Sequence, residues 1–541
     1  MSCAFRLAAA LLAVALGLGC SRPAMQSSRS ARNNWTVPGV LRLGEDEEPD
    51  SLNLMFGHTA ATDAISGLLF SFVLRYDALG NYVPDLATQV PTVANGGISR
   101  DGRQIVVHFR RGVVWADGSP LNANDWLFTY HAVENPANNV KTRYGWDDIA
   151  SAAAPDPYTL VIRLKRPNVA VLGILAMGGA GYPPMPAHLL AKLPNLNSAA
   201  FNERPLSSGP YLLREWSHGS SLTFVPNPRY FRGAPKLKEV IWKVIPDVNT
   251  LFNQLATHEI DVYPNVSPNA VPRLASIAGI RVDRRLIADW RHLGMNCSRP
   301  QLADPRVRRA IALAVDWKRI NDTVFHGLDQ LAVSDIFPQS WAAPTLAPYR
   351  YDPAAAKRLL AQAGWKPGTD GILRKGELSM RLTIYATTGH QENTESQVLI
   401  QSMLRDVGID VAIRNYPGSY LFATDGPLYT GKYDLEWSIE TNGPDPDNSG
   451  DWNGAFIPPR GANTSWLDDP IVNATSAAAA STFDEPARKR LYQREEERIR
   501  EVVPAVFFSW RRNYTAMNVD LKNYVPAAFI GDSWNAWQWS I

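Results

Sequence analysis

The stretch that decides the fold is Asp289–Trp317, DWRHLGMNCSRPQLADPRVRRAIALAVDW. Its first part is typical of an extended segment, and a helix is expected to follow at once. Asp304 can cap the helix by accepting free backbone N–H groups, and Pro305 suits the first helical position. From Val307 to Ile320 apolar residues recur at helical spacing, which predicts an amphipathic helix at the boundary between two lobes. The basic residues expected on its solvated face are Arg306, Arg308, Arg309, Lys318 and Arg319.

A second helix with the same signals is predicted in Tyr351–Trp365, YDPAAAKRLLAQAGW. Asp352 is the expected cap, Pro353 begins the first turn, and Gly364 ends the helix. Further along, a βαβ unit is predicted from a strand at 378–386, a helix at 392–406 and a strand at 409–416. The lobe that follows residue 288 is therefore expected to be α/β.

The ordered succession LGMN, DPRVRRAIALAVDWKRI and YDPAAAKRLLAQAGW resembles the family 5 extracellular solute-binding proteins. These are the oligopeptide, dipeptide and nickel receptors of ABC importers. An earlier passage, FRRGVVWADGSPLNANDW at 109–126, is similar to the same family. The resemblance implies an α/β, two-lobe periplasmic-binding-protein-like fold of type II, in the large peptide-binding cluster, with an extra subdomain in the first lobe.

The expected organisation of the chain follows from this resemblance and from local patterns. The chain is expected to begin with a signal peptide at 1–19 and a lipidated tether at 20–35. Lobe I is expected at 36–287, with the extra subdomain at roughly 61–184. Lobe II is expected at 288–502, and a C-terminal return to lobe I at 503–541. Within lobe II we expect an exposed loop rich in Gly, Pro and Asp from Glu440 to Gly461 and a charged helix from Glu485 to Val502. The aromatic segment Ser533–Ile541 is typical of a strand.

The N-terminus predicts export. An apolar run follows Arg6, and small residues precede Cys20, which is the pattern of a secretory signal. Leu16-Gly17-Leu18-Gly19-Cys20 resembles a lipobox, with its leucine one place early, so that Cys20 is expected to carry lipid. An ordinary cleavage site near Ala24 remains the alternative. We expect a protein of the periplasm or cell surface that is attached to a membrane through its N-terminal lipid.

Composition excludes several classes of function. Fifty-four Lys and Arg nearly balance 52 Asp and Glu, for a formal net charge of +2, so no overall field favours nucleic acid. The chain contains no HExxH, GxSxG, P-loop or GxGxxG motif and no Cys pair at zinc spacing. Asp445-Pro446-Asp447 lacks the spacing of a calcium loop and is better explained as a turn. We therefore expect no enzyme activity, no cofactor and no metal site.

The resemblance implies which residues contact the ligand. In this family a carboxylate after a tryptophan meets the ligand's ammonium, and Trp437 is followed by Ser438 and Glu440 here, although Asp445 is an alternative carboxylate. Phe56, His58 and Thr59 correspond to the first-lobe contact, and Thr387 and His390 to a region where dipeptide receptors place an arginine. Asn442 completes the expected set.

The function implied by the resemblance is capture of a peptide or peptide-like solute between the lobes by hinge closure, with delivery to the transmembrane subunits of an ABC permease. We expect the protein to act as a monomer. Two alternatives remain open at this point: a signalling or chaperone-like binding protein on the same fold, and a secreted hydrolase.

Overall fold

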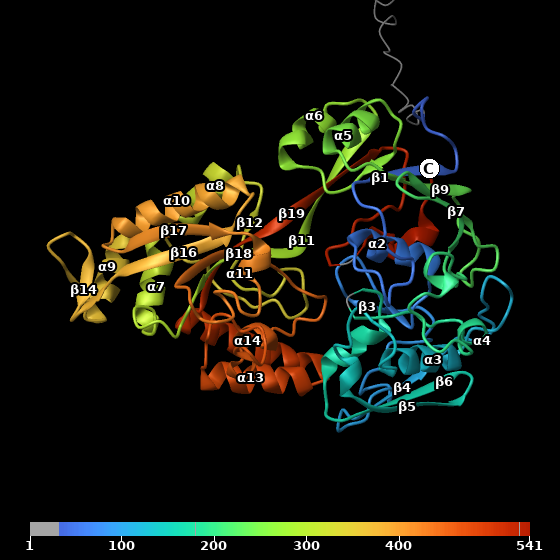
Figure 1. The fold of residues 1–541 in the computed structure, drawn as a ribbon, viewed down its shortest axis with the longest axis horizontal. Helices are drawn as coiled ribbons and strands as arrows, with labels where there is room; N and C mark the ends of the chain where they lie inside the picture. Colours follow the sequence, from blue (N-terminus) through green and yellow to red (C-terminus); the bar gives the residue numbers. More distant parts are fainter. Residues whose placement is uncertain (1–31, 179, 530) are drawn as a thin grey trace, which may run out of the picture.

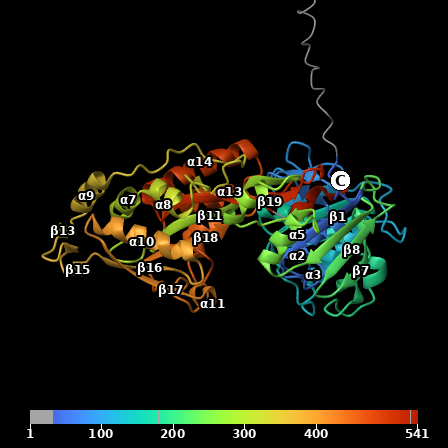
Figure 2. The same ribbon diagram turned by 90° about the horizontal axis from the view of Figure 1, so that it is seen from above.

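The computed structural model describes residues 32–178, 180–529 and 531–541. Two lobes lie side by side, joined by two long antiparallel strands, β11 (Ile280–Met295) and β19 (Ala505–Asn518) (Figure 1). Seen from above, the same two strands occupy the junction between the lobes (Figure 2). Within these described ranges, no helix is both long enough and apolar enough to cross a membrane.

One sheet of 11 strands runs through both lobes. Its order is β17 (Asp410–Tyr416), β16 (Arg381–Thr387), β18 (Leu435–Thr441), β11, β19, β10 (Val262–Tyr263), β1 (Val40–Glu45), β9 (Glu239–Val244), β8 (Ser221–Pro226) and β7 (Tyr211–Ser217), with β12 (Gln330–Leu331) paired to β19. β16 is parallel to β17 and β18, and β1 is parallel to β9 and β10. The continuous sheet joins lobes that have separate apolar cores.

The first lobe holds the largest apolar core, which includes residues from both ends of the described chain, such as Leu41 and Trp539. Its helices and 3-10 helices are α2 (Ala60–Leu69), α3 (Ala123–Glu134), η1 (Trp146–Asp148), η2 (Val169–Leu175), α4 (Ala187–Leu190), η3 (Ala200–Asn202), α5 (Val248–Ala256), η4 (Pro268–Ala270), α6 (Val271–Ala275) and η6 (Asp532–Gln538). Two smaller sheets complete it, β2 (Leu74–Tyr76) with β3 (Tyr82–Pro84), and β4 (Gln104–His108), β6 (Thr159–Leu164) and β5 (Ile149–Asp156).

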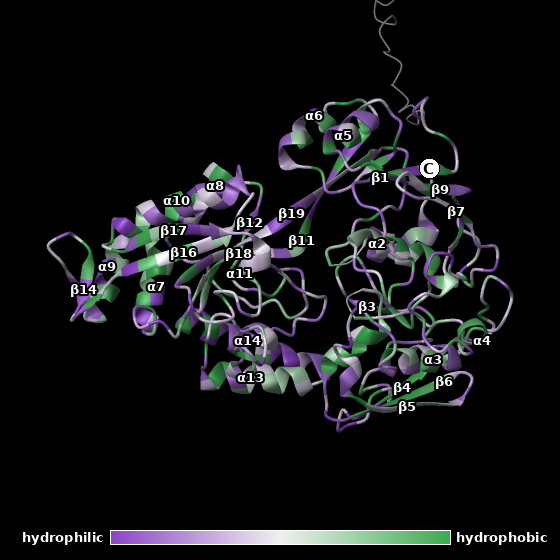
Figure 3. Ribbon diagram, in the orientation of Figure 1, coloured by the Kyte–Doolittle hydropathy of each residue, from purple (hydrophilic) through white to green (hydrophobic). Residues whose placement is uncertain are grey.

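The second lobe packs helices on its part of the sheet. These are α7 (Pro305–Ala314), α8 (Trp317–Val324), α9 (Pro353–Gln362), α10 (Gln391–Arg405), α11 (Gly418–Leu421), α12 (Ser449–Trp452), η5 (Gly454–Phe456), α13 (Pro470–Ser481) and α14 (Glu485–Val502). A small hairpin sheet of β13 (Lys366–Pro367), β14 (Leu373–Lys375) and β15 (Leu378–Ser379) lies beside α9. Hydrophobic residues, in green, occur in the helices and strands of both lobes, whereas β19 is mostly purple, and so hydrophilic, where it crosses between them (Figure 3).

The caps predicted from the sequence form as expected. Asp304 accepts the N–H of Arg306 at 2.9 Å at the start of α7, and Asp352 accepts that of Ala355 at 2.7 Å at the start of α9. The expectation of a single helix through Ile320 is wrong. Helix α7 ends with Val315 as its C-terminal cap, and Asp316 caps a separate helix, α8. Asp316 lies one residue before Trp317 and competes as a new cap for the backbone N–H groups.

One basic residue of α7 is not solvated. Arg308 is only 3% exposed, whereas Arg306 and Arg309 are exposed. Its guanidinium donates to the carbonyl oxygens of Leu302 at 2.7 Å and Val502 at 2.8 Å. Val502 ends α14, where carbonyl groups lack helical partners. Arg308 therefore joins the end of α14 to the start of α7, which the local pattern could not indicate.

Two further expectations are wrong. Ser533–Ile541 forms no strand; most of it belongs to η6, which packs on α2. The loop from Glu440 to Gly461 is not exposed throughout, because Asn448 and Trp452 are 4% exposed and hydrogen bonded to the buried Asp335. In both segments, contacts with distant parts of the chain decide the outcome.

The two lobes meet at a break in the ladder between β11 and β19. Leu286 pairs with Arg512 and Trp290 with Trp510, so that Ile287, Ala288 and Asp289 lie opposite Arg511 alone. A bulge of this kind interrupts the regular pairing and lets the strands bend. The interruption is the candidate hinge between the lobes.

Candidate ligand-binding cleft between the lobes

The carboxyl ends of parallel strands from both lobes meet at the space between the lobes. In the second lobe β16 and β18 end at Thr387 and Thr441, and in the first lobe β1 and β10 end at Glu45 and Tyr263. Open α/β sheets bind ligands at the carboxyl ends of their strands. The arrangement therefore identifies this space as the candidate site.

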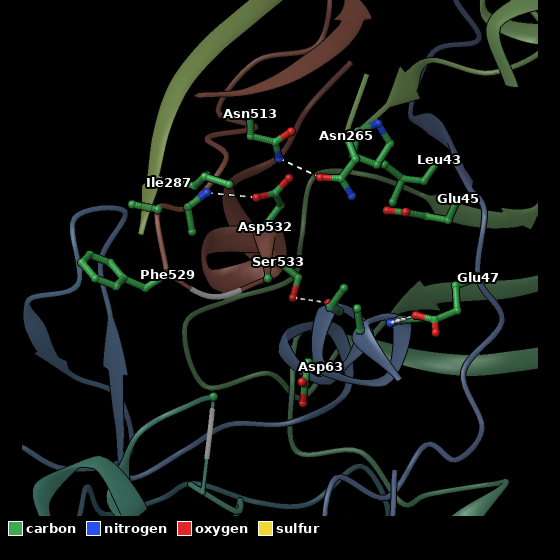
Figure 4. A pocket seen from close by; sticks show the side chains of 18 of the residues that line it. Leu43, Glu45, Glu47, Asp63, Asn265, Ile287, Asn513, Phe529, Asp532 and Ser533 are labelled. Carbon is green, nitrogen blue, oxygen red and sulfur yellow. Dashed lines mark hydrogen bonds between the residues drawn. The ribbon is translucent and has the colours of Figure 1, made fainter. Parts of the chain in front are cut away.

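A cavity of about 350 Å³ lies here, and residues from both lobes and the hinge line it (Figure 4). The first lobe contributes Glu45, the last residue of β1, and Asn265, which follows β10. Ile287 and Asp289 enter it from the hinge, and Thr441 from the end of β18. At its floor, Ser533 of η6 donates to the carbonyl oxygen of Ala64, which fixes η6 against α2.

The cavity is strongly acidic. Six carboxylates line it, and among the described residues no Lys, Arg or His does. They are Glu45, Asp46, Glu47, Asp63, Asp289 and Asp532. A concave, acidic surface attracts cations through the summed field of its charges.

Burial raises the pKa values of three of these carboxyl groups, Glu45, Asp63 and Asp532. Burial, followed by the nearby Asp532, Asp46 and Glu47, raises the pKa of Glu45 well above its usual value. Burial also raises the pKa of Asp532, although Ala527 and Tyr524 donate hydrogen bonds to it. Ionisation of these carboxyl groups costs free energy in the empty cavity, and a bound cation would offset that cost.

The second lobe adds a smaller acidic recess of about 30 Å³, lined among others by His292, Glu436, Glu440 and Asp451. The Nε2 atom of His292 lies 3.6 Å from Oε1 of Glu436. Gly294 makes room for this pair, because a Cβ there would lie 2.6 Å from Oε1 of Glu436. The Glu440 side chain is exposed, but the protein around it limits its hydration, which raises the pKa of its carboxyl group. Among its charged neighbours, His292 lowers this pKa and Glu436 raises it.

Asp445, the alternative carboxylate, already has a partner. Arg488 of α14 donates to both of its oxygens, at 2.6 and 2.8 Å. Glu440, in contrast, makes no hydrogen bond with another described side chain. The two acidic residues therefore differ in availability, and only Glu440 lies in the acidic recess.

The structure separates the residues expected to bind ligand into groups. Thr387, His390, Trp437 and Ser438 line another recess of about 110 Å³ beside the start of α10. Trp437 is 2% exposed and stacks on Trp317, so most of its ring belongs to the core of the second lobe. Glu440 lines the acidic recess instead.

The remaining residues expected to bind ligand make hydrogen bonds or packing contacts within the protein. Asn442 accepts a hydrogen bond from Trp290 at 2.8 Å and donates to the carbonyl of Asp335. Thr59 caps α2, and the N–H of His58 donates to Asp50 at 3.0 Å. Phe56 packs against the first-lobe core. Cys20 and the segment 1–19 lie outside the described residues, and the expected tether reaches Trp35, which stacks on His258 at 4.2 Å.

Sequence reasoning missed the acidic side chains of the first lobe and His292. One signal was available, because four acidic residues follow one another at Glu45–Glu48. Asp532 and Asp63 carried no such signal, since only the packing of η6 on α2 brings their helices together.

Comparison with known proteins decides the family. The profile of the bacterial extracellular solute-binding proteins, family 5 Middle, matches residues 81–456. The chain belongs to this family. The oligopeptide-binding protein AppA of Bacillus subtilis matches this chain over nearly the full length of both. The two are 26% identical over 529 residues, which cover 95% of this chain and 94% of AppA.

Solved structures agree with the two-lobe fold of this family 5 protein. The structure of B. subtilis AppA in complex with a nonapeptide has a TM-score of 0.70 at 25% identity, covering 93% of this chain and 99% of that one. NikZ from Campylobacter jejuni in complex with Ni(L-His) has a TM-score of 0.72 at 26% identity, covering 94% and 100%. The chain is a solute-binding protein of the kind that serves ABC importers, and its family consists of binding proteins rather than enzymes.

Proposed function

We propose that this protein captures a peptide or peptide-like solute in the cavity between its lobes and delivers it to the transmembrane subunits of an ABC permease. The single observation that carries the proposal is the cavity at the carboxyl ends of strands from both lobes, next to the hinge. The AppA complex with a nonapeptide supports a peptide as the class of solute.

Closure about the hinge is the proposed mechanism. A ligand that contacts both lobes binds the closed arrangement more tightly than the open one, and it shifts the equilibrium by that difference in affinity. Thr441 already contributes to the cavity from the second lobe. The bulge at Ile287–Asp289 is where we expect the strands to bend.

Glu440 is the proposed partner of the ligand's terminal ammonium. It lies in the recess with His292 and Glu436, without a hydrogen-bond partner among the described side chains, whereas Asp445 is held by Arg488. A hydrogen bond to a charged group contributes about 1.5–3 kcal/mol. We propose secondary ligand contacts for the recess of Thr387, His390, Trp437 and Ser438. The same proposal extends to Phe56, His58, Thr59 and Asn442.

Export and attachment belong to the same proposal. Lipid on Cys20 would hold the protein on the outer side of a membrane, in the periplasm or at the cell surface, within reach of its permease. A monomer suffices, because one chain supplies both lobes of the cavity.

The test of the Glu440 assignment uses one tripeptide in two forms, with a free and with an acetylated N-terminus. Isothermal titration calorimetry should show about tenfold tighter binding of the free amine, and Glu440→Gln should remove that preference. Glu377→Gln, an exposed acid between β14 and β15, is the matched control and should keep it. An unchanged preference in Glu440→Gln would remove Glu440 from the site.

A further inference from the structure

We infer that the solute carries positive charge beyond its terminal ammonium, as a peptide with a basic side chain does, and that this second cation binds to the acidic floor of the first lobe. The acidic floor is defined as Glu45, Asp46, Glu47, Asp63 and Asp532. The inference rests on the proposed function and specifies its class of solute.

The chain itself supplies little positive charge to neutralise the acidic floor. Only Asp63 has a basic partner among the described residues, Lys141, whose Nζ lies 3.4 Å away at the rim. Glu47 accepts the N–H of Ala61 at 3.2 Å, and Asp532 accepts that of Ala527 at 2.9 Å. Glu45 and Asp46 make no side-chain hydrogen bond with any described residue. These two carboxylates are therefore available to a ligand.

A second, independent observation indicates a polar ligand rather than a purely electrostatic surface. Trp242 lines the same cavity and is 3% exposed, and its indole Nε1 has no hydrogen-bond acceptor among the described residues. His292 is 4% exposed and lines the recess of the second lobe, and its Nδ1 likewise finds no partner in the part of the chain that the structure describes. Buried polar atoms are rarely left unpaired. A peptide offers both kinds of group that these walls lack, basic side chains and backbone carbonyl oxygens.

An inorganic cation fits the acidic floor less well than an organic one. In the part of the chain that the structure describes, no three Asp, Glu, His or Cys side chains lie close enough together to hold a metal ion. The carboxylates are instead spread over α2, η6 and the segment after β1, around a cavity of about 350 Å³. That spacing suits an extended cation such as a lysine or arginine side chain.

The charge arrangement also makes binding dependent on pH. Burial and the neighbouring carboxylates of Asp532, Asp46 and Glu47 raise the pKa of Glu45, and a bound cation favours its ionised form. Binding of the cation should therefore release protons, and the affinity should fall as the pH is lowered. A peptide without a basic side chain should show a smaller change.

The experiment compares two tripeptides that differ in one charge, Ala-Lys-Ala and Ala-Gln-Ala, by calorimetry. The expected result is about tenfold tighter binding of Ala-Lys-Ala, with proton release visible as a heat that varies with the ionisation enthalpy of the buffer. Glu45→Gln should reduce the preference for lysine, taken as the ratio of the two affinities, to below about threefold. Glu377→Gln serves as the control.

The outcomes separate the inference from the proposed function. Equal binding of the two peptides would overturn the inference and leave peptide capture intact, whereas binding of neither peptide would overturn both. If Glu45→Gln proves unstable by thermal melting, the lysine preference of the unaltered protein decides the matter, and its absence contradicts the inference.

Discussion

Arg308 and Arg309 are neighbours on α7 with opposite surroundings. Arg308 is buried and donates to carbonyl oxygens at the end of α14, whereas Arg309 is exposed. The amphipathic pattern placed both outside the apolar face, because periodicity describes one helix and not what packs on it. The same limit applies to Glu440 and Asp445, which the sequence could not rank; in the structure Arg488 pairs with Asp445, and only Glu440 lies in the acidic recess.

Replacing Arg308 tests this contact. Arg308→Met should lower the free energy of unfolding by about 3 kcal/mol, because the buried carbonyl oxygens of Leu302 and Val502 lose their donor. Arg309→Met should change it by less than about 0.5 kcal/mol. Urea denaturation followed by circular dichroism measures both, and equal losses in the two variants would contradict the assigned role.

At the scale of elements, α14 shows what the sequence could and could not predict. Its bounds, Glu485–Val502, are those expected from its charged composition, and Asp484 caps it. Yet Glu495 and Glu496 are at most 1% exposed and lie near Asp335, which braces the segment after β18 through Asn448 and Trp452. Charge alone predicts exposure, so only the packed structure could reveal this buried acidic cluster.

The buried cluster predicts how stability varies with pH. Burial, followed by the charge of Asp335, raises the pKa of Glu495 well above its usual value. A carboxyl group whose pKa is raised by folding stabilises the protein least at high pH, since its contribution is lost as the pH rises through the folded-state pKa. Glu495→Gln should therefore raise the melting temperature at pH 8 and change it less at pH 5. A larger gain at pH 5 in differential scanning calorimetry would contradict the assignment.

At the scale of the whole molecule, the sequence predicted two lobes through family resemblance, and the caps and periodic faces predicted many of their elements. The resemblance placed the ligand between the lobes, but the sequence did not predict the lining of the cavity, which forms where η6 packs on α2 and where the ends of β1, β10 and β18 converge. Residues as distant as Glu45 and Asp532 share that wall. No local sequence pattern indicates that these two residues lie close together.

Hinge closure should be visible in the shape of the molecule. Small-angle X-ray scattering should show a decrease in the radius of gyration when a saturating basic peptide is added, because the lobes approach about the bulge at Ile287–Asp289. Glu440→Gln, titrated with the same peptide, should need a higher concentration for the same decrease. An unchanged radius with bound peptide would exclude closure.

Mass spectrometry of the protein purified under native conditions from its own host tests the central claim most directly, if the bound solute is then released by denaturation. We expect a peptide, and one that carries at least one Lys or Arg, because the cavity offers six carboxylates and, among its described lining residues, no basic side chain. Release of a sugar or a metal chelate in place of a peptide would contradict the account.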